Sequence, residues 1–329
     1  MKVLFIGLGS IGSHHLRLLN ELKNVKNICW RSGKGKYPND LDEKYCIKAF
    51  ENLDHAIEEK PDFAIIANPT ALHVETAIAI AKADIPFLIE KPVSDRLEGI
   101  EALNKIIHDK NLSVMVGFQL RHHPGYKKLI KLINSGEIGQ PLNLQGYVGQ
   151  YLPDWHPDND YQESYSARKN LGGGVILDLC HEIDIAISIL GQVSKVSCFC
   201  GHYSDLEIET EDMADITLEH QDRRLSHIHL NYLERNYEWV TRVMGTSGTV
   251  IWDYGRGYVE IIQTDGTTKR WNDPDGFERD WLFRDQIKQW LKVLDGRATP
   301  VVDLDAGIVV TQVALAAKRS SYEKRHIEL

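Results

Sequence analysis

The sequence lacks long hydrophobic runs. Of its 329 residues, 43% are hydrophobic, yet charged residues or glycines interrupt every run before it reaches the about 18 apolar residues that a membrane helix needs. We therefore expect a soluble protein with no membrane partner. The apolar fraction also excludes a disordered chain. At roughly 100–200 residues per domain, the length predicts about two domains.

Cysteine and positive charge are scarce as well. The five cysteines are an odd number without the spacing of a disulfide framework, which predicts reduced thiols and a cytoplasmic protein. We expect no metal site, because Cys198, Cys200 and His202 lack the second ligand cluster of a zinc site. A net charge of −9 disfavours nucleic acid as a partner. Any bound anion must therefore be held by local groups.

The chain begins with an apolar run, a glycine-rich turn and a helical pattern. Residues 2–6 predict a strand, and residues 13–22 carry apolar side chains at helical spacing. Between them, the first glycine permits a tight turn, the second lets the backbone approach a pyrophosphate, and the third lets the helix pack closely. The phosphates then lie at the helix N-terminus. The alternative is a plain glycine-rich turn. The predicted dinucleotide-binding residues are Gly7, Gly9, Ser10, Ile11 and Gly12.

The residues after the second predicted strand bear on the choice of cofactor. This strand, residues 27–30, ends about twenty residues beyond the glycines, where NAD-binding proteins usually carry Asp or Glu. Here Arg31 and Ser32 follow the strand, with Lys34 and Lys36 close behind. A guanidinium binds a 2′-phosphate in a forked geometry, and a serine hydroxyl adds a donor. We predict NADP(H) as the preferred cofactor and NAD(H) as the second choice. An ordinary solvated basic loop is the alternative interpretation.

The order of strands and helices predicts an α/β protein with two domains. Up to residue 120, short buried strands alternate with amphipathic helices, which is typical of a Rossmann-type, doubly wound parallel sheet. We therefore expect an NAD(P)-binding domain over residues 1–120. Residues 121–329 predict an α+β domain for substrate binding and self-association, with a large, mostly antiparallel sheet. Its expected strands include residues 142–147, 193–200, 213–218 and 225–233, and its helices residues 126–134, 281–294 and 306–318.

Several motifs together resemble the Gfo/Idh/MocA family, the group of glucose-fructose oxidoreductase and inositol dehydrogenase. The resemblance covers essentially the whole chain and rests on the order and spacing of the motifs. It is specific for the family and much less so for the substrate. Besides the glycine turn, the motifs are Asn68-Pro69-Thr70-Ala71-Leu72-His73, Glu90-Lys91-Pro92, Gly117-Phe118-Gln119-Leu120-Arg121-His122-His123-Pro124, and Gly172-Gly173-Gly174 leading into Asp178-Leu179-Cys180-His181-Glu182-Ile183-Asp184.

The resemblance implies that Lys91 lies beside the nicotinamide and that the Lys91-Pro92 bond is cis. The chemistry of the residue supports this role, because Lys91 follows an apolar strand and ligands bind at the carboxyl ends of parallel strands. An ammonium there stabilises charge on the substrate oxygen as hydride leaves the carbon, and Glu90 can orient it. A surface Glu-Lys pair is the alternative. The further cofactor contacts that the family position implies are Asn68, Pro69, His73 and Glu90.

His181 is the candidate general acid and base, because an imidazole carries a proton in either direction near neutral pH. If residues 178–190 form one helix, Asp178 shares a face with His181 and is a second catalytic candidate. Many relatives place this aspartate four residues before the histidine, where this chain has Leu177, so the role of Asp178 stays open. A histidine packed in the core is the alternative for His181.

A polar and aromatic loop, residues 150–168, has the chemistry of a carbohydrate pocket. Aromatic faces pack on the C–H surface of a sugar, while amides, guanidinium groups and hydroxyls bind its polar substituents. Arg121 and Arg168 are also suited to a carboxylate or a diphosphate. A surface loop whose aromatics pack it down or contact another subunit is the alternative. The predicted substrate-binding residues are Gln119, Arg121, Trp155, Tyr165, Arg168, Asp178 and His181.

These features predict an NADP(H)-dependent oxidoreductase that transfers hydride to or from a hydroxyl or keto carbon of a sugar, nucleotide sugar or polyol. The family resemblance implies a homodimer or homotetramer. Two rivals remain. One is an NAD-dependent glycoside hydrolase of the same family, which releases sugar without net redox change. The other is a catalytically silent cofactor-binding protein, which the presence of both Lys91 and His181 disfavours.

Overall fold

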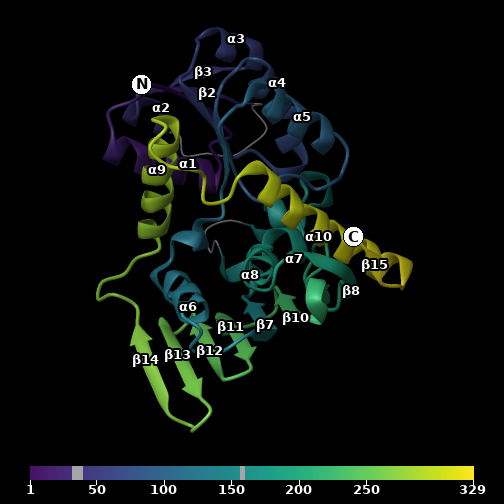
Figure 1. Ribbon diagram of the computed structural model, residues 1–329. Helices are drawn as coiled ribbons and strands as arrows, with labels where there is room; N and C mark the ends of the chain where they lie inside the picture. Colours follow the sequence, from purple (N-terminus) through teal and green to yellow (C-terminus); the bar gives the residue numbers. More distant parts are fainter. Residues whose placement is uncertain (32–39, 156–159) are drawn as a thin grey trace. The chain divides into compact units, whose positions relative to one another are not determined.

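The computed structural model describes residues 1–31, 40–155 and 160–329. The chain forms two compact units, and Figure 1 labels many of their helices and strands. Unit 1 consists of Met1–Gln119 and Glu278–Ile308, and unit 2 of Leu120–Phe277 and Val309–Leu329. The first break lies where we expected a boundary. The segment Glu278–Ile308, however, belongs to unit 1 and not to the second domain.

A six-stranded parallel sheet of order β3-β2-β1-β4-β5-β6 forms the centre of unit 1. The two central strands, β1 and β4, are almost entirely buried, as expected where helices cover both faces of a sheet. This confirms the predicted Rossmann-type fold. The strands are β1 (Lys2–Ile6), β2 (Lys26–Trp30), β3 (Lys48–Phe50), β4 (Phe63–Ile66), β5 (Phe87–Ile89) and β6 (Val114–Val116). The described helices are α1 (Ser10–Leu22), α2 (Leu41–Lys44), α3 (Leu53–Glu58), η1 (Thr70–Leu72), α4 (His73–Lys82), α5 (Ile100–Lys110) and α9 (Asp280–Leu294).

Helix α9 packs against the rest of unit 1 through an apolar face and a charged end. The ring of Trp290 meets Phe63 edge-on, with 6.1 Å between the ring centroids. At the start of α9, Asp280 accepts a hydrogen bond of 2.7 Å from Arg17 of α1. Helical periodicity predicts the extent of α9 well. It cannot show which sheet the apolar face meets, because that depends on contacts between residues far apart in the sequence.

A nine-stranded sheet of order β14-β13-β12-β11-β7-β10-β9-β8-β15 forms the centre of unit 2. Most neighbouring strands are antiparallel, which confirms the predicted sheet. Strand β10 runs parallel to β7 and antiparallel to β9. Alternation tells which side chains share a face and carries no information on strand direction. The strands are β7 (Pro141–Gly149), β8 (Val193–Gly201), β9 (Met213–His220), β10 (Leu225–Asn231), β11 (Glu238–Gly245), β12 (Gly248–Asp253), β13 (Tyr258–Gln263), β14 (Thr268–Asn272) and β15 (Ile327–Glu328).

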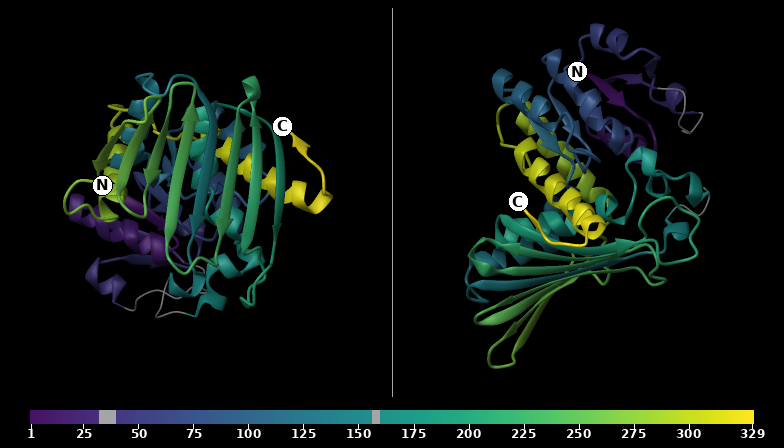
Figure 2. Two further views of the ribbon diagram at one scale, coloured as in Figure 1. Left: turned by 90° about the horizontal axis from the view of Figure 1, so that it is seen from below. Right: turned by 90° about the vertical axis from the view of Figure 1, so that its right-hand side faces the viewer.

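Helices cover one face of this sheet. Strand β12 contacts α6, β7 contacts α8, and β9 contacts α7. On β9, Ala214, Ile216 and Leu218 are buried, while Asp215 between them is exposed on the opposite face. Figure 2 shows that opposite face, over which no described helix of unit 2 lies. The helices with residues in unit 2 are η2 (Gln119–His122), α6 (Pro124–Asn134), η3 (Leu152–Asp154), η4 (Tyr161–Glu163), η5 (Tyr165–Ala167), η6 (Lys169–Leu171), α7 (Val175–Asp178), α8 (His181–Leu190), η7 (Gln221–Arg223) and α10 (Leu304–Glu323).

Helix length and hydropathy also bear on membranes. Within the described ranges, no helix is both long enough and apolar enough to cross a bilayer.

Candidate functional site

The glycine-rich turn of unit 1 has the close contacts that its sequence predicts. Gly7 has a φ of +85°, and a Cβ there would lie 2.8 Å from the backbone nitrogen of Asn68. A Cβ on Gly12 would lie 2.1 Å from the carbonyl oxygen of Gly7, so only glycine lets α1 approach the turn this closely. At Gly9, by contrast, no described atom lies within 4 Å of such a Cβ. The backbone is therefore open to a ligand at the second glycine.

The N-terminus of α1 is suited to an anion. Its N-cap residue, Gly9, offers no side-chain hydrogen bond, and the first turn carries no acidic residue. Ser10 is exposed and Ile11 half-buried at the start of the helix. The first backbone N–H groups of a helix have no partners within the helix, and the helix dipole adds partial positive charge. A pyrophosphate fits this end of α1.

Lys91 follows β5 and is half-buried, and the Lys91-Pro92 bond is cis, as the resemblance implies. The preceding residue, Glu90, is only 6% exposed and accepts a hydrogen bond of 2.6 Å from Nε2 of His15. Gly117, after β6, provides the space, because a Cβ there would lie 2.9 Å from the Glu90 carboxylate. Glu90 thus has a partner on α1, which sequence reasoning missed, whereas we expected it to contact the cofactor and orient Lys91.

His73 lies inside unit 1 and links two loops. Its Nδ1 is 2.8 Å from the carbonyl oxygen of Pro92, and its Nε2 is 2.8 Å from that of Asn68. Burial lowers the pKa of His73, and the two carbonyl groups oppose this effect. Both ring nitrogens are engaged with the protein backbone. His73 therefore links the Asn68 and Lys91 loops, and its expected contact with the cofactor stays a prediction.

Asn68 has an acceptor available for a ligand. Its Nδ2 donates to the hydroxyl of Thr76 at 3.0 Å. Its Oδ1 is buried and has no hydrogen-bond partner in the described part of the chain. Pro69 follows and leads into η1. A buried acceptor without a partner costs free energy that a ligand donor can recover, so the residues present fit a bound dinucleotide.

Arg31 already has an anionic partner. Its Nη2 lies 2.5 Å from the carboxylate of Asp42. This pair engages the guanidinium that we expected to bind a 2′-phosphate. Ser32, Lys34 and Lys36 lie outside the described residues.

In unit 2, the expected helix over residues 178–190 is two helices. Helix α7 ends at Asp178 and α8 begins at His181, with Leu179 and Cys180 between them. The apolar pattern continues through this break, so the sequence carries no stop signal for it. The prediction that Asp178 and His181 share a face of one continuous helix is therefore wrong.

Asp178 is held by two hydroxyl groups. Its Oδ2 accepts hydrogen bonds from Ser166 at 2.5 Å and from Tyr232 at 3.0 Å. Burial, with the carboxylate of Asp178 beside it, raises the pKa of Tyr232 well above its ordinary value. Trp155 meets the ring of Tyr232 edge-on at 5.3 Å. Tyr232 thus contacts both Asp178 and the predicted substrate residue Trp155, and Asp178 in turn bonds the loop residue Ser166.

His181 begins α8 and is 3% exposed. Its ring lies 5.9 Å from the ring of Trp239, measured between centroids. The next residue, Glu182, accepts hydrogen bonds from the indole of Trp239 at 2.5 Å and from Thr241. Burial raises the pKa of Glu182 to about 7. A Cβ on Gly146 would lie 2.3 Å from the Glu182 carboxylate, so glycine at that position leaves the space.

The other predicted substrate residues differ in their contacts. Arg121 forms a forked pair with Asp184, with N–O distances of 2.7 and 2.8 Å, which raises the pKa of Arg121. That pair occupies the fork we expected to hold a substrate anion. Arg168 is bonded through Nε to the carbonyl oxygen of Gln162 and lies partly exposed. Oε1 of Gln119 is buried without a hydrogen-bond partner among the described residues.

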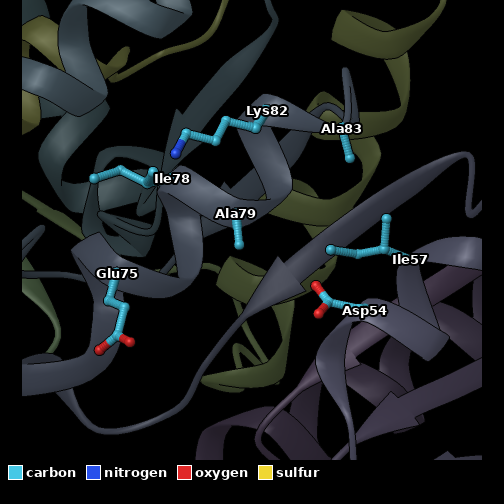
Figure 3. A pocket seen from close by; sticks show the side chains of 7 residues that line it. All are labelled: Asp54, Ile57, Glu75, Ile78, Ala79, Lys82 and Ala83. Atoms are coloured by element: carbon cyan, nitrogen blue, oxygen red, sulfur yellow. The ribbon is translucent and has the colours of Figure 1, made fainter.

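Two concave surfaces in the described part of the chain lie away from these residues. A cavity of about 540 Å³ lies between α3 and α4 in unit 1, where Figure 3 shows Asp54 and Ile57 on one side and the α4 side chains on the other. A second hollow, of about 360 Å³, lies over strands of the large sheet. None of the predicted site residues lines either of them.

Comparison with known proteins identifies relatives of both halves of the chain. Residues 1–118 match the family described as an oxidoreductase family with an NAD-binding Rossmann fold, and residues 126–251 match the GFO/IDH/MocA C-terminal domain. Levoglucosan dehydrogenase of Pseudarthrobacter phenanthrenivorans is 35% identical over 155 residues, which are 45% of this chain and 39% of that protein. Myo-inositol 2-dehydrogenase of Thermotoga maritima is 26% identical over 100% of this chain and 98% of its own length.

Solved structures show the same fold. The complex of levoglucosan dehydrogenase with NADH and L-sorbose superposes with a TM-score of 0.88 and covers 100% of this chain and 98% of that one. The sequence identity is 18%, so this likeness establishes the fold alone.

Proposed function

The chain belongs to the Gfo/Idh/MocA family of NAD-binding oxidoreductases, and on that premise we propose a dehydrogenase that acts on a CH–OH carbon of a sugar or polyol. The observation that carries the proposal is one connected cluster in unit 1. Gly7 abuts Asn68, and the two ring nitrogens of His73 lie 2.8 Å from the carbonyl oxygens of Asn68 and Pro92. Lys91 and the open glycine turn thus belong to one set of loops after neighbouring parallel strands, where such folds bind ligands.

The residues supply charge stabilisation and proton transfer. A bound nicotinamide cofactor would supply the site that accepts or donates hydride. In the oxidation direction, His181 accepts the hydroxyl proton, while the Lys91 ammonium stabilises the charge that develops on the oxygen. In reduction the two roles reverse. Trp155, Tyr165 and Arg168 are our candidates for contacts with the sugar, and Asp178 is a candidate for orienting the polar groups around them.

A panel assay tests the proposed reaction. The protein is incubated with NADP or NAD and with free sugars, inositols or nucleotide sugars, and the reduced nicotinamide is measured by absorbance. We expect reduction of the cofactor with at least one polyol. Release of sugar from a glycoside without added cofactor would instead support the glycoside hydrolase. Tight cofactor binding without turnover of any substrate would support the silent binding protein.

We propose NADP(H) as the preferred cofactor, on the strength of Arg31 and the basic residues that follow it in the sequence. The Arg31–Asp42 pair favours a competing assignment, in which Asp42 accepts a hydrogen bond from the 2′-hydroxyl of NAD. Relatives crystallised with NADH also support that competitor. Titration of the protein with NADPH and with NADH, followed by nicotinamide fluorescence, separates the two. We expect the lower Kd for NADPH, and an equal or lower Kd for NADH would contradict this.

The variant Asp42→Asn sharpens the choice between the two cofactors. If Arg31 binds a 2′-phosphate, removal of its carboxylate partner leaves NADPH binding intact or tighter. If Asp42 binds the ribose of NAD, the same change weakens NADH binding. The matched control is Arg31→Gln, which lowers NADPH affinity only in the first case.

We also propose that two or four chains associate through the outer face of the large sheet. Phe199 of β8 is 78% exposed on this face. In the hollow of about 360 Å³ on the same face, His229 lies 2.8 Å from Asp215 and stacks on Tyr147. Aromatic residues are enriched at protein interfaces relative to the rest of the surface. Light scattering of the wild type and Phe199→Glu tests this, and a monomeric wild type at micromolar concentration would exclude it.

We infer a cytoplasmic setting from the thiols. None of the five cysteines forms a disulfide, and three of them are buried. Cysteines without disulfide bonds are the usual state in a reducing compartment. Mass spectrometry of thiols alkylated during cell lysis is expected to find all five reduced, and a native disulfide would contradict the inference.

A further inference from the structure

Two buried histidines hold the residues on either side of Lys91. Nε2 of His15 lies 2.6 Å from the carboxylate of Glu90, directly before Lys91. Nδ1 of His73 lies 2.8 Å from the carbonyl oxygen of Pro92, directly after it. The two histidines are 0% and 1% exposed, so neither ring is available to a ligand.

The two contacts join the Lys91 turn to the helix after the glycine turn and to the Asn68 loop. His15 lies on α1, three residues after Gly12, and its ring packs edge-on against Phe283. Its bond to Glu90 therefore ties the helix after the glycine turn to the end of β5. His73 begins α4, and its other ring nitrogen lies 2.8 Å from the carbonyl oxygen of Asn68. This second contact ties the Asn68 loop to the turn after Lys91.

The space around Glu90 admits little movement. Gly117 provides room for the carboxylate, and a Cβ at that position would reach to 2.9 Å from it. The backbone N–H of Glu90 is bonded to the carbonyl oxygen of Ile66 in β4. A carboxylate buried in this way is stable only with a polar partner, and His15 is the partner present.

We propose that His15 and His73 are positioning residues, which clamp the Lys91 turn from both sides and hold it in register with the glycine turn and the Asn68 loop. The proposal rests on the role of Lys91 in the proposed function. It assigns Glu90 and His73 to the support of the site and not to contact with the cofactor. A small misplacement of a charge-stabilising group lowers turnover strongly while ground-state binding is retained.

The kinetic test compares His15→Leu and His73→Leu with their glutamine counterparts, which keep an amide N–H donor. We expect kcat of the leucine variants to fall by about tenfold to a hundredfold. The Kd for NADPH should change less. The glutamine variants should have kcat values between those of the leucine variants and the wild type. His14→Gln, a change of the neighbouring residue on α1, is the matched control and keeps the wild-type kcat. Leucine variants with wild-type kcat would overturn the proposal, and so would parallel losses of kcat and NADPH affinity.

A chemical readout separates this inference from the proposed function. Reductive methylation with formaldehyde and a borohydride, analysed by mass spectrometry, gives the rate at which each lysine is modified. We expect the modification rate at Lys91 to change severalfold in the leucine variants. If a leucine variant does not fold, the glutamine variant takes its place, and we expect a smaller change of the same rate. The exposed Lys105 serves as the internal control. An unchanged rate at Lys91 would reject the clamp even if the protein is an active dehydrogenase, and a changed rate would support it even if no polyol is turned over.

Discussion

Two buried glutamates, one in each unit, have different partners. Glu90 directly precedes Lys91 and pairs with the imidazole of His15 at 2.6 Å. Glu182 directly follows His181 and accepts hydrogen bonds from the indole of Trp239 and the hydroxyl of Thr241. Each carboxylate lies in space left by a glycine of a neighbouring segment, at Gly117 and Gly146 respectively.

The difference between the partners has consequences for charge. An imidazole can carry a positive charge, whereas an indole and a hydroxyl stay neutral. With only neutral donors, burial is the dominant influence on Glu182 and raises its pKa to about 7. Two similar backbone positions beside candidate catalytic residues are thus stabilised by different partners. We therefore expect the two positions to respond differently to substitution of those partners.

The largest effect is expected on turnover, from the two residues beside these glutamates. Lys91→Ala and His181→Ala should each lower kcat by about 10²–10⁴-fold, because each removes charge stabilisation or proton transfer from the reacting atoms. Cofactor affinity should stay close to that of the wild type. Steady-state kinetics and NADPH titration measure both quantities. Near-normal turnover in both variants would reject the assigned roles.

Substitution of the partners of the two glutamates gives the next largest effect, on stability. His15→Leu leaves a buried carboxylate without its partner, and breaking such a pair costs about 3–5 kcal/mol of unfolding free energy. Trp239→Phe removes one neutral donor, while Thr241 still donates to Glu182, so we expect about 1–3 kcal/mol. Urea unfolding of both variants measures the difference. Equal losses would show that the charge of the partner does not matter.

The pH dependence of stability is expected to report on Glu182. The pKa of Glu182 rises from 4.5 to about 7 on folding, so the folded state keeps a proton that the unfolded state has released. Glu182 therefore does not destabilise the folded state below pH 4.5. As the pH rises from 4.5 to about 7, its deprotonation lowers the free energy of unfolding by about 3 kcal/mol in total. Glu182→Gln should remove this component. Urea unfolding at several pH values tests it, and identical pH profiles of the variant and the wild type would contradict it.

The parts of this molecule that are local in sequence were predictable. The strand, glycine turn and helix at the N-terminus follow from glycine chemistry and periodicity, and the structure has Gly7 at positive φ and Gly12 against Gly7. The cis bond at Lys91-Pro92 followed from the family resemblance. In each case a short segment contains the physical cause.

The contacts that sequence reasoning missed join distant residues. His15 and Glu90 are 75 positions apart, and Arg121 and Asp184 are 63 apart. No periodicity shows that such side chains meet, because the pairing depends on how strands and helices pack. The break between α7 and α8 was missed for a related reason, since the apolar residues continue through it. A histidine beside a glycine turn gives no sign of whether it faces a ligand or the core.

The most direct test of the proposed reaction is cofactor reduction by the wild type and Lys91→Ala in the presence of a polyol substrate. We expect the wild type to convert NADP to NADPH, and Lys91→Ala to bind NADPH with similar affinity but to turn over at least about a hundredfold more slowly. A wild type that binds the cofactor and reduces none of it with any sugar or polyol would contradict a dehydrogenase built on Lys91.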